Sequence, residues 1–534
     1  TKQRRPKGDG EGTYNAVFGV AGTPDGMPRS FCFSHGASQS AVRPGGIPRV
    51  DGRLSMVGFG ALVGDGKGNL WAGERDRIAR LVRYPLDEAS GGRKPPEERR
   101  KPPDRLKSDR PKPSGGLRPP LAEDAPRLPC HVVFAPAGTT TDGSGYTAIE
   151  VGKDGKVYVG AARYGDYAWL LRFDPAASPT FMDRVVSMKQ LTGERREGIS
   201  TQGKIHAKIV VAGDGKVWFA SKQAHEVFDT RPEYGEDPDG YPGGHLCCFD
   251  PKTGFSRSVG ILKRQEGLMG GVIDDARGRL YYRSDPKGHL LAYDLKTGDV
   301  RDRGHVGSAC RYMAIDKHGA VYLAGRGPFL CRYDPETDYV EDLRIKVEGE
   351  GGYSSPYVLA IGPNGKLYGV GVTHPSIMEF DIDKLQRGAT EVVMRNAAPA
   401  APPGYPVSDI HAAVFGKDGR LYYPLNTTGP VEKGGKPVQH LRLMRFDPAP
   451  LALPSPPKGG REGRARGARK AETVGVPQVV GLDEEKVKQA YARPGKFRLY
   501  VMQGAAVGAD GTLFLMGISP QLHVACFPKL TAAK

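Results

Sequence analysis

The stretch GKVYVGAARYGDYAWLLRFDP (155–175) carries the pattern that decides the fold. It opens with the glycine of a KDG turn, continues with a short strand that bears Tyr158, and ends in a second strand that closes with Phe173-Asp-Pro. A tight hairpin turn needs a positive φ, which glycine adopts without steric cost. Together with the apolar residues before the turn, the stretch predicts three strands of a small antiparallel sheet.

The same unit recurs along the chain. Its turn and second strand return as GKGNLW, KDGKVY, GDGKVW, ARGRLY, KHGAVY, PNGKLY, KDGRLY and ADGTLF. The turn glycines are Gly68, Gly155, Gly215, Gly278, Gly319, Gly365, Gly419 and Gly511. The shortest spacings, 41 and 46 residues, equal the length of one propeller blade.

One such sheet cannot bury its faces alone, whereas sheets stacked in a closed ring bury them and remove most exposed edges. We therefore predict an all-β fold with a single β-propeller. Eight repeats favour eight blades. Seven blades result if the first and last repeats share a blade through the strand TYNAVFGVA (13–21).

The units GNLWAGERDRIARL (68–81) and 155–175 resemble repeats of streptogramin-lyase-type and gluconolactonase-like propellers. The resemblance covers most of the chain and implies the propeller architecture. It does not imply a particular reaction, because one fold hosts many functions.

The positive charge of the chain is concentrated in three segments rather than spread over the repeats. The formal net charge is +17, and residues 1–7, 88–127 and 449–472 carry +4 each. The last two are rich in Pro, Gly, Lys and Arg, a composition that cannot bury enough apolar surface to fold. We predict a basic arm (1–12) and a propeller (13–534) with disordered basic insertions at 88–127 and 449–472. The alternative is arms that grip a polyanion; the location of the charge argues against a nucleic-acid-binding domain.

Cysteine usage and hydropathy restrict the class further. The seven cysteines are odd in number and form no CxxC pair, which argues against a disulfide framework or a zinc ribbon. No apolar run reaches the length of a transmembrane helix. The compartment is not determined by the sequence; since the chain begins with Thr1, removal of a leader would favour an exported protein. We expect a monomer.

Insertions and turns assign the two faces of the predicted propeller. The glycine turns and the two basic insertions fall on one face, and the long loop 222–244 falls on the other, the top face. The residue eight or nine positions before each turn glycine should line the rim of the central funnel there, with a register uncertainty of one residue that exchanges Arg311 with Tyr312. The predicted rim residues are Phe59, Tyr146, His206, Met269, Arg311, Tyr357, His411 and Gln503.

The third repeat points to a chemistry. His206 opens its first strand and His225 follows about twenty residues later, a pattern similar to that of propeller polysaccharide lyases such as the ulvan lyases. That resemblance implies β-elimination, with His or Tyr as base and acid and a cation that neutralises the uronate. A base must reach the proton beside the carboxylate, and positive charge must stabilise the enolate-like intermediate.

We therefore predict a glycan-active propeller, a lyase acting on an acidic polysaccharide in the top funnel. The predicted catalytic residues are His206, His225, Tyr234, Arg311, Tyr357 and His411. The predicted substrate-binding residues are Tyr146, Lys208, Arg231, Tyr241, His245 and Gln503.

Other functions remain open at the level of sequence. No metal site is assigned, yet three of the histidines, His206, His225 and His411, with Gln503, would suit a divalent ion such as Ca²⁺, Mn²⁺ or Zn²⁺. A channel metal would fit a lyase or lactonase acting on a small molecule. The remaining alternative is a binding or scaffold propeller without catalysis.

Overall fold

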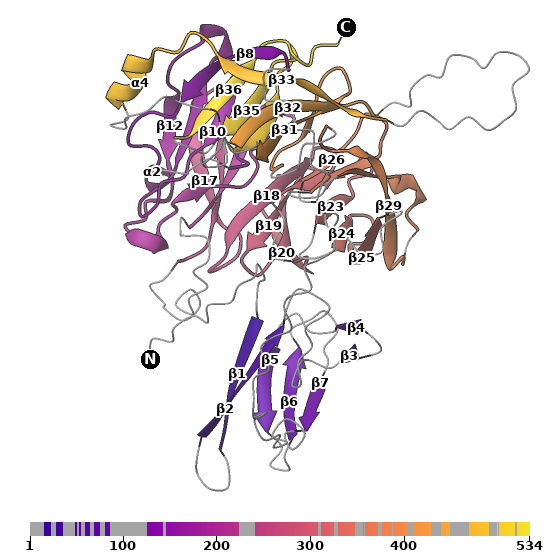
Figure 1. Cartoon of the computed structure of the whole chain (residues 1–534). Coiled ribbons are helices and arrows are strands. Elements are labelled where there is room, and N and C mark those ends of the chain that lie inside the picture. The colour runs from indigo at the N-terminus through magenta and orange to yellow at the C-terminus, as the bar shows by residue number, and fades with distance from the viewer. Residues whose placement is uncertain are drawn as a thin grey trace, which may run out of the picture. The chain divides into compact units, whose positions relative to one another are not determined.

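Short antiparallel sheets follow one another along the chain, as the repeats predict (Figure 1). The structure is a computed structural model. It describes strands in the first 115 residues (15–22, 28–35, 49–50, 53–54, 59–64, 69–74, 81–85) and, beyond them, residues 125–141, 146–223, 241–307, 311–324, 329–347, 356, 358–371, 376–386, 388–402, 410–428, 439–448, 469–490, 499, 501–517 and 521–533.

The chain divides into a smaller unit, residues 1–115, and a larger unit, residues 116–534. The smaller unit contains two hairpins and a three-stranded sheet. Its strands are β1 (Asn15–Gly22), β2 (Pro28–His35), β3 (Arg49–Val50), β4 (Arg53–Leu54), β5 (Phe59–Gly64), β6 (Asn69–Glu74) and β7 (Leu81–Pro85). The first repeat, around Gly68, therefore falls in the smaller unit.

The described residues of the larger unit form seven blade-like groups of strands, which we call sheets, although two pairs of them are joined into eight-stranded sheets by a shared edge. The first contains β9 (Ile149–Val151), β10 (Val157–Gly160), β11 (Trp169–Phe173) and β12 (Asp183–Ser187). The second contains β13 (Lys204–Ile205), β14 (Val210–Val211), β15 (Val217–Lys222), β16 (His245–Phe249) and β17 (Ser256–Ile261). The third contains β18 (Gly267–Asp274), β19 (Arg279–Asp285), β20 (His289–Asp294) and β21 (Val300–His305).

The fourth sheet contains β22 (Met313–Ile315), β23 (Val321–Ala324), β24 (Phe329–Asp334) and β25 (Tyr339–Val347). The fifth contains β26 (Val358–Ile361), β27 (Leu367–Val370), β28 (Ser376–Phe380) and β29 (Glu391–Pro399). The sixth contains β30 (Val414–Phe415), β31 (Leu421–Thr428), β32 (Gln439–Phe446) and β33 (Ala471–Val479). The seventh contains β34 (Met502–Val507), β35 (Leu513–Gly517), β36 (His523–Phe527) and β8 (Arg127–Phe134).

The first strands of these sheets face one another and make the ring of a β-propeller. β34 contacts β9, β9 contacts β14, and β14, β18, β22 and β26 follow in order, while β30 contacts β34. The fifth and sixth sheets meet through the rings of Tyr368 and Phe415, 5.4 Å apart. The preference for eight blades is not confirmed, because seven blade-like groups of strands are found in the described residues of the larger unit. The predicted propeller span of 13–534 stays a prediction for residues 13–115.

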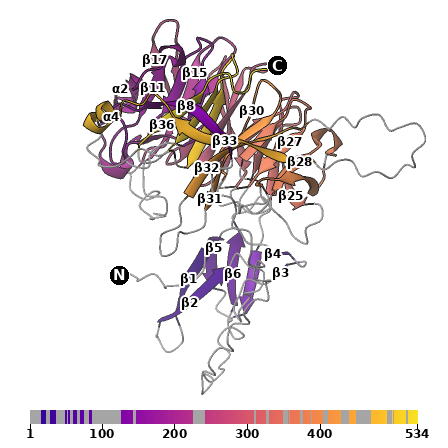
Figure 2. The ribbon, with the colours of Figure 1, turned by 45° about the horizontal axis from the view of Figure 1, so that its top comes forward.

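The ring closes through β8. This strand precedes the first sheet in the chain but pairs antiparallel with β36, the third strand of the last sheet, with Val133 opposite Val524 (Figures 1 and 2). The closing strand is therefore not TYNAVFGVA, which forms β1 and pairs with β2. The sequence RLPCHVVF suits this position because Cys130, Val132 and Val133 are buried in it.

Fourth strands join two pairs of sheets at their outer edges. β25 pairs in parallel with β29, and β33 pairs in parallel with β8, so that edge strands are covered rather than exposed. β33 begins at Ala471, within the insertion predicted at 449–472, so the prediction of disorder is wrong for the last residues of that segment; residues 449–468 lie outside the described residues. Arg469, just before β33, donates two hydrogen bonds to the carboxylate of Glu379 in β28, at 2.6 and 2.8 Å.

Few helices occur in the described residues. They are the 3-10 turns η2 (Pro175–Ala177), η3 (Gly198–Ser200) and η4 (Ile382–Lys384) and the helices α2 (Met188–Thr192) and α4 (Glu484–Ala490). None of the helices in this described part of the chain has the length and apolar character needed to cross a membrane.

The core lies between neighbouring sheets and is built from the second-strand residues of the repeat. Tyr158, Tyr322, Tyr368 and Tyr422 are at most 1% exposed. Several of their hydroxyls donate to the turn aspartate of the same repeat, as Tyr158 does to Asp154 at 2.7 Å. This explains why the motif couples an acidic turn to an aromatic strand: a buried hydroxyl needs a partner.

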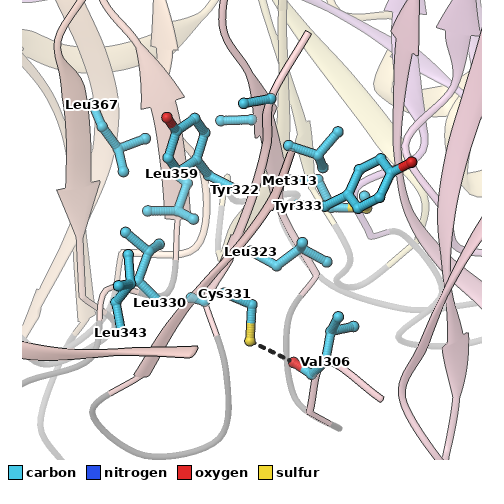
Figure 3. Close-up of a cluster of buried hydrophobic side chains, with 14 of the residues drawn as sticks. Val306, Met313, Tyr322, Leu323, Leu330, Cys331, Tyr333, Leu343, Leu359 and Leu367 are labelled. Carbon is cyan, nitrogen blue, oxygen red and sulfur yellow. Dashed lines mark hydrogen bonds between the residues drawn. The ribbon is translucent and has the colours of Figure 1, made fainter. Parts of the chain in front are cut away.

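The cluster between the third, fourth and fifth sheets illustrates this packing (Figure 3). Leu323, Leu330 and Leu343 pack there, and the thiol of Cys331 donates to the carbonyl of Val306 at 3.3 Å. The five cysteines of the larger unit whose side chains are described, Cys130, Cys247, Cys248, Cys331 and Cys526, are all buried and free, as expected for small core residues.

The described turn glycines have positive φ, which confirms the predicted turns; they are Gly155, Gly215, Gly278, Gly319, Gly365, Gly419 and Gly511.

Replacing two of these glycines with alanine compares an open turn with a tightly packed one. Replacing Gly155 with Ala should cost only the left-handed backbone penalty of about 1–2 kcal/mol, because nothing lies within 4 Å of the added Cβ. Gly511→Ala should cost more, since its Cβ would lie 2.4 Å from the nitrogen of Ala532. Urea denaturation measures both; equal losses would contradict the packing at Gly511.

Candidate functional site

The predicted rim residues lie near the beginnings of the first strands. Tyr146 precedes β9, Arg311 precedes β22, His411 precedes β30, and Gln503 lies in β34. His206 occupies the break between β13 and β14. The ring centroids of Tyr146 and His206 are 4.1 Å apart, and Arg311 donates to Oε1 of Gln503 at 3.3 Å. Side chains from four different sheets thus meet at one end of the channel.

Four basic side chains surround this meeting point, and we call Lys204, Lys222, Arg283 and Arg311 the cationic cluster. Lys204 and Lys222 are opposite each other in the β13–β15 pair. Asp285 accepts hydrogen bonds from Lys222 at 2.5 Å and from Arg283 at 3.2 Å and forms an ion pair with both. Arg283 is 0% exposed. The cluster therefore gathers several basic side chains in a buried region.

Asp285 is held in its ionised form by these cations. Burial is the largest influence and pushes its pKa upward, but Lys222 and Arg283 together hold the pKa well below the ordinary 3.8. Removing a charge from such a network leaves the opposite charges unpaired, which is far more costly than breaking an exposed ion pair.

His206 stands next to the cluster as a neutral ring. It is 4% exposed, and neither Nδ1 nor Nε2 has a hydrogen-bond partner in the described part of the chain. Burial, followed by the positive charges of Arg311 and Lys222, holds the pKa of His206 well below 6.5. The ring is therefore uncharged at neutral pH and has one nitrogen lone pair able to accept a proton.

Two tyrosine hydroxyls complete the group. The hydroxyls of Tyr146 and Tyr164 lie 2.6 Å apart, and Lys204 donates to that of Tyr146 at 3.3 Å. Burial, and then the charges of Lys222 and Arg311, lower the pKa of Lys204 from 10.5 to about 6. Neutral bases, hydroxyl donors and fixed cations therefore share one site, the combination that removes a proton next to a carboxylate.

Tyr312 spans the channel beside this group. Its hydroxyl donates to the backbone carbonyl of Gln503 at 2.5 Å and also to that of His411. Arg311 and Tyr312 therefore both reach across to other sheets, so these contacts do not choose between the two registers.

Lys208, predicted to bind substrate, lies deeper along the channel. Its amine forms an ion pair with Glu150 at 2.9 Å and donates to the carbonyls of Ile149 at 2.9 Å and Ala505 at 3.3 Å. These partners belong to the first and seventh sheets, so the side chain ties three sheets together.

Tyr241 and His245, also predicted to bind substrate, belong to a separate group between the first two sheets. Nε2 of His245 lies 3.0 Å from Glu194 and its Nδ1 lies 2.7 Å from the hydroxyl of Ser258. Oε1 of Gln202 accepts a hydrogen bond from the hydroxyl of Tyr241 at 3.0 Å, and Nε2 of Gln202 donates one to Glu194 at 3.2 Å. The structure does not bring these two residues into contact with His206.

Several predicted residues fall outside the described residues: His225, Arg231, Tyr234 and Tyr357, together with Phe59, whose side chain is not described. Their roles stay predictions. The predicted metal set includes His225 and is likewise untested; among the described residues no three His, Cys, Asp or Glu side chains are grouped as metal ligands.

The sequence interpretation missed Lys204, Lys222, Arg283, Asp285 and Tyr164. Two of them lie directly opposite a residue of the first strand: Lys222 opposite Lys204, and Arg283 opposite Met269. Considering the cross-strand partner of each predicted rim residue would have found Arg283, because directly opposed side chains on one face touch.

A cavity of about 630 Å³ lies at the other end of the first strands. Its lining includes the turn residues Gly152 to Gly155 that follow β9, and Gly508 to Asp510 that follow β34, over an apolar floor with Val133 and Phe514. Tyr146 precedes β9 whereas this cavity begins at its far end. The cavity is thus distinct from the cationic cluster.

Fold and site together define a β-propeller with a buried basic site at one end of its channel. No family model and no curated protein matches the chain. Among solved structures it is similar to a streptogramin B lyase at 11% identity, over 74% of this chain and 97% of that one, with a TM-score of 0.43. It is similar to a catalytically inactive virginiamycin B lyase from Staphylococcus aureus with quinupristin at 12% identity, over 74% and 99%, with a TM-score of 0.42.

A chain of a mitotic checkpoint complex is similar to the same extent, with 10% identity over 78% of this chain and 96% of that chain and a TM-score of 0.43. At such identities the likeness concerns the fold alone, and proteins of different function share it. The resemblance to streptogramin-lyase-type propellers therefore holds for architecture, and the local resemblance to polysaccharide lyases stays a prediction.

Proposed function

We propose that the larger unit is a glycan-active lyase that cleaves an acidic, uronate-containing polysaccharide by β-elimination at the cationic cluster. The observation that carries the proposal is the buried, neutral ring of His206, without a hydrogen-bond partner in the described residues, beside four basic side chains.

Each step has a candidate group in this site. Arg311 and Lys222 bind the uronate carboxylate and stabilise the negative charge that develops on it. His206 takes the proton from the carbon beside the carboxylate. The carbon–oxygen bond at the next carbon breaks, a C=C bond forms, and the hydroxyl pair of Tyr146 and Tyr164 supplies the proton for the departing oxygen.

The test is direct. The full chain, incubated with a panel of uronate polysaccharides, should raise the ultraviolet absorbance of the new C=C bond conjugated with the carboxylate, and a neutral polysaccharide should not. The same assay is repeated with a chelator. A metal-dependent lyase or lactonase would lose its activity there, whereas the proposed lyase would keep it. A folded protein that binds a polyuronate in calorimetry without changing the absorbance would instead be a binding propeller, and the lyase proposal would be wrong.

A further inference from the structure

Lys204 is a buried lysine of the site without a described ion-pair partner. It is 4% exposed, and no carboxylate forms an ion pair with it within the described ranges, whereas Lys208 and Lys222 each have one. Its Nζ lies 4.7 Å from the centroid of the Tyr146 ring and 4.5 Å from that of Tyr164. The amine is thus held between two aromatic rings.

This setting keeps the amine neutral. Burial and the neighbouring charges of Lys222 and Arg311 lower its pKa to about 6, while Asp285 acts weakly in the opposite direction. A desolvated lysine beside other cations carries a nitrogen lone pair at neutral pH, the condition under which lysine attacks carbonyl carbon.

We propose that Lys204 is a nucleophilic amine that forms an imine with a small anionic carbonyl compound, an α-keto or α-formyl carboxylate. The carboxylate would lie against Arg311 and Lys222. A compound of a few atoms is sufficient, because the reaction needs only one carbonyl carbon and one carboxylate. This activity goes beyond the β-elimination and does not depend on it, because it needs only the amine and its neighbours.

The reaction balances without a cofactor. The lone pair of Nζ attacks the carbonyl carbon, and the carbonyl oxygen becomes a hydroxyl. The hydroxyl of Tyr146, 3.3 Å from Nζ, protonates this group as it leaves as water. The amine gives up both of its protons in the process: the first passes to the carbonyl oxygen when the hydroxyl forms, and the second restores Tyr146 as the C=N bond forms. One amine and one carbonyl compound give one imine and one water, with no change of oxidation state.

The experiment traps the imine on the intact protein. The chain is incubated with glyoxylate and cyanoborohydride, which reduces an imine to a stable carboxymethyl-lysine, and modified lysines are located by peptide mass spectrometry. Modification of Lys204 should be half-maximal near pH 6 and complete at neutral pH. Lys216, whose pKa is raised by its hydrogen bond with Asp214, is the internal control and should react only in alkaline solution.

Two comparisons sharpen the result. Acetaldehyde, a neutral aldehyde of similar size, should modify Lys204 more slowly than glyoxylate, because it has no carboxylate for the cationic cluster to hold. Tyr146→Phe should slow the modification without moving its pH midpoint far, whereas Lys296→Arg, at an exposed turn outside the channel, should leave it unchanged.

The outcomes separate this inference from the proposed function. Selective modification of Lys204 without lyase activity would support the imine and contradict the β-elimination. If the protein shows lyase activity but Lys204 is modified no faster than Lys216 at neutral pH, the β-elimination is supported and the imine is contradicted. Circular dichroism of Lys204→Met confirms that a loss of labelling is not a loss of fold.

Discussion

Replacing Asp285 with asparagine lowers the free energy of unfolding by about 3–5 kcal/mol, the cost of breaking a buried ion pair from one side. The substitution keeps the size of the side chain but leaves Lys222 and the fully buried Arg283 without their shared counter-charge. Urea denaturation followed by circular dichroism and by tryptophan fluorescence measures the loss.

A matched control is available in the second sheet. Asp214 pairs with Lys216 at 2.5 Å, but the two side chains are 52% and 41% exposed. Asp214→Asn should therefore change stability by no more than about 1 kcal/mol. Losses of similar size in the two variants would show that burial of the Asp285 network does not matter.

The effect of Asp285 also has a pH signature. Because the pKa of Asp285 in the folded protein lies well below 3.8, its stabilisation is fully present above that value and disappears only as the pH falls further. The difference between the native protein and Asp285→Asn should thus be constant at neutral and mildly acidic pH and shrink in strong acid. If the stability difference between the native protein and Asp285→Asn disappeared as the pH was raised, the prediction would be contradicted, because an ionised Asp285 stabilises the fold more at high pH than in strong acid.

Replacing His206 with alanine lowers the rate of the proposed β-elimination about 10²–10⁴-fold, the usual contribution of a general base. Most of the loss should be in kcat rather than KM, since Arg311 and Lys222 still bind the carboxylate. The ring nitrogens of His206 have no hydrogen-bond partner to lose among the described residues, but the substitution removes a buried ring that packs on Tyr146, so the melting temperature should fall and circular dichroism at the assay temperature must show a folded protein. His318→Ala, at an exposed turn, is the control and should leave the rate unchanged.

The pH profile tests the same residue. His206 acts in its neutral form, and its pKa lies well below 6.5, so the ring should stay neutral as the pH is lowered to 6.5. The acid limb of kcat should accordingly lie below 6.5. Full activity of His206→Ala, or a kcat limb at the ordinary histidine value, would assign the base to another residue.

The fold was largely predictable because its determinants are local. A turn glycine such as Gly155 and a second-strand residue such as Tyr158 sit at fixed offsets in every repeat, and the structure places them in turns and core as expected. The closing strand was not predictable in this way. β8 has no glycine turn of its own, and its partner β36 is at the other end of the larger unit.

The site was predictable in part for the same reason. The rim positions of Tyr146, His206 and Arg311 follow from counting back along one strand, and the three do meet. The pairing of Lys222 with Asp285 joins two different sheets, and no spacing in the sequence predicts it. Lys208 and His245 were assigned to the site by nearness in sequence, whereas their contacts lie with Glu150 and Glu194.

The way the ring closes has a consequence for biosynthesis. β8 is the first strand of the larger unit to leave the ribosome, and β36 is the last of its strands. Throughout translation of the intervening sheets β8 has neither its antiparallel partner β36 nor its parallel partner β33. The nascent chain therefore carries an apolar strand with unpaired backbone groups until β33 and β36 have been made, the kind of edge that recruits chaperones or neighbouring chains.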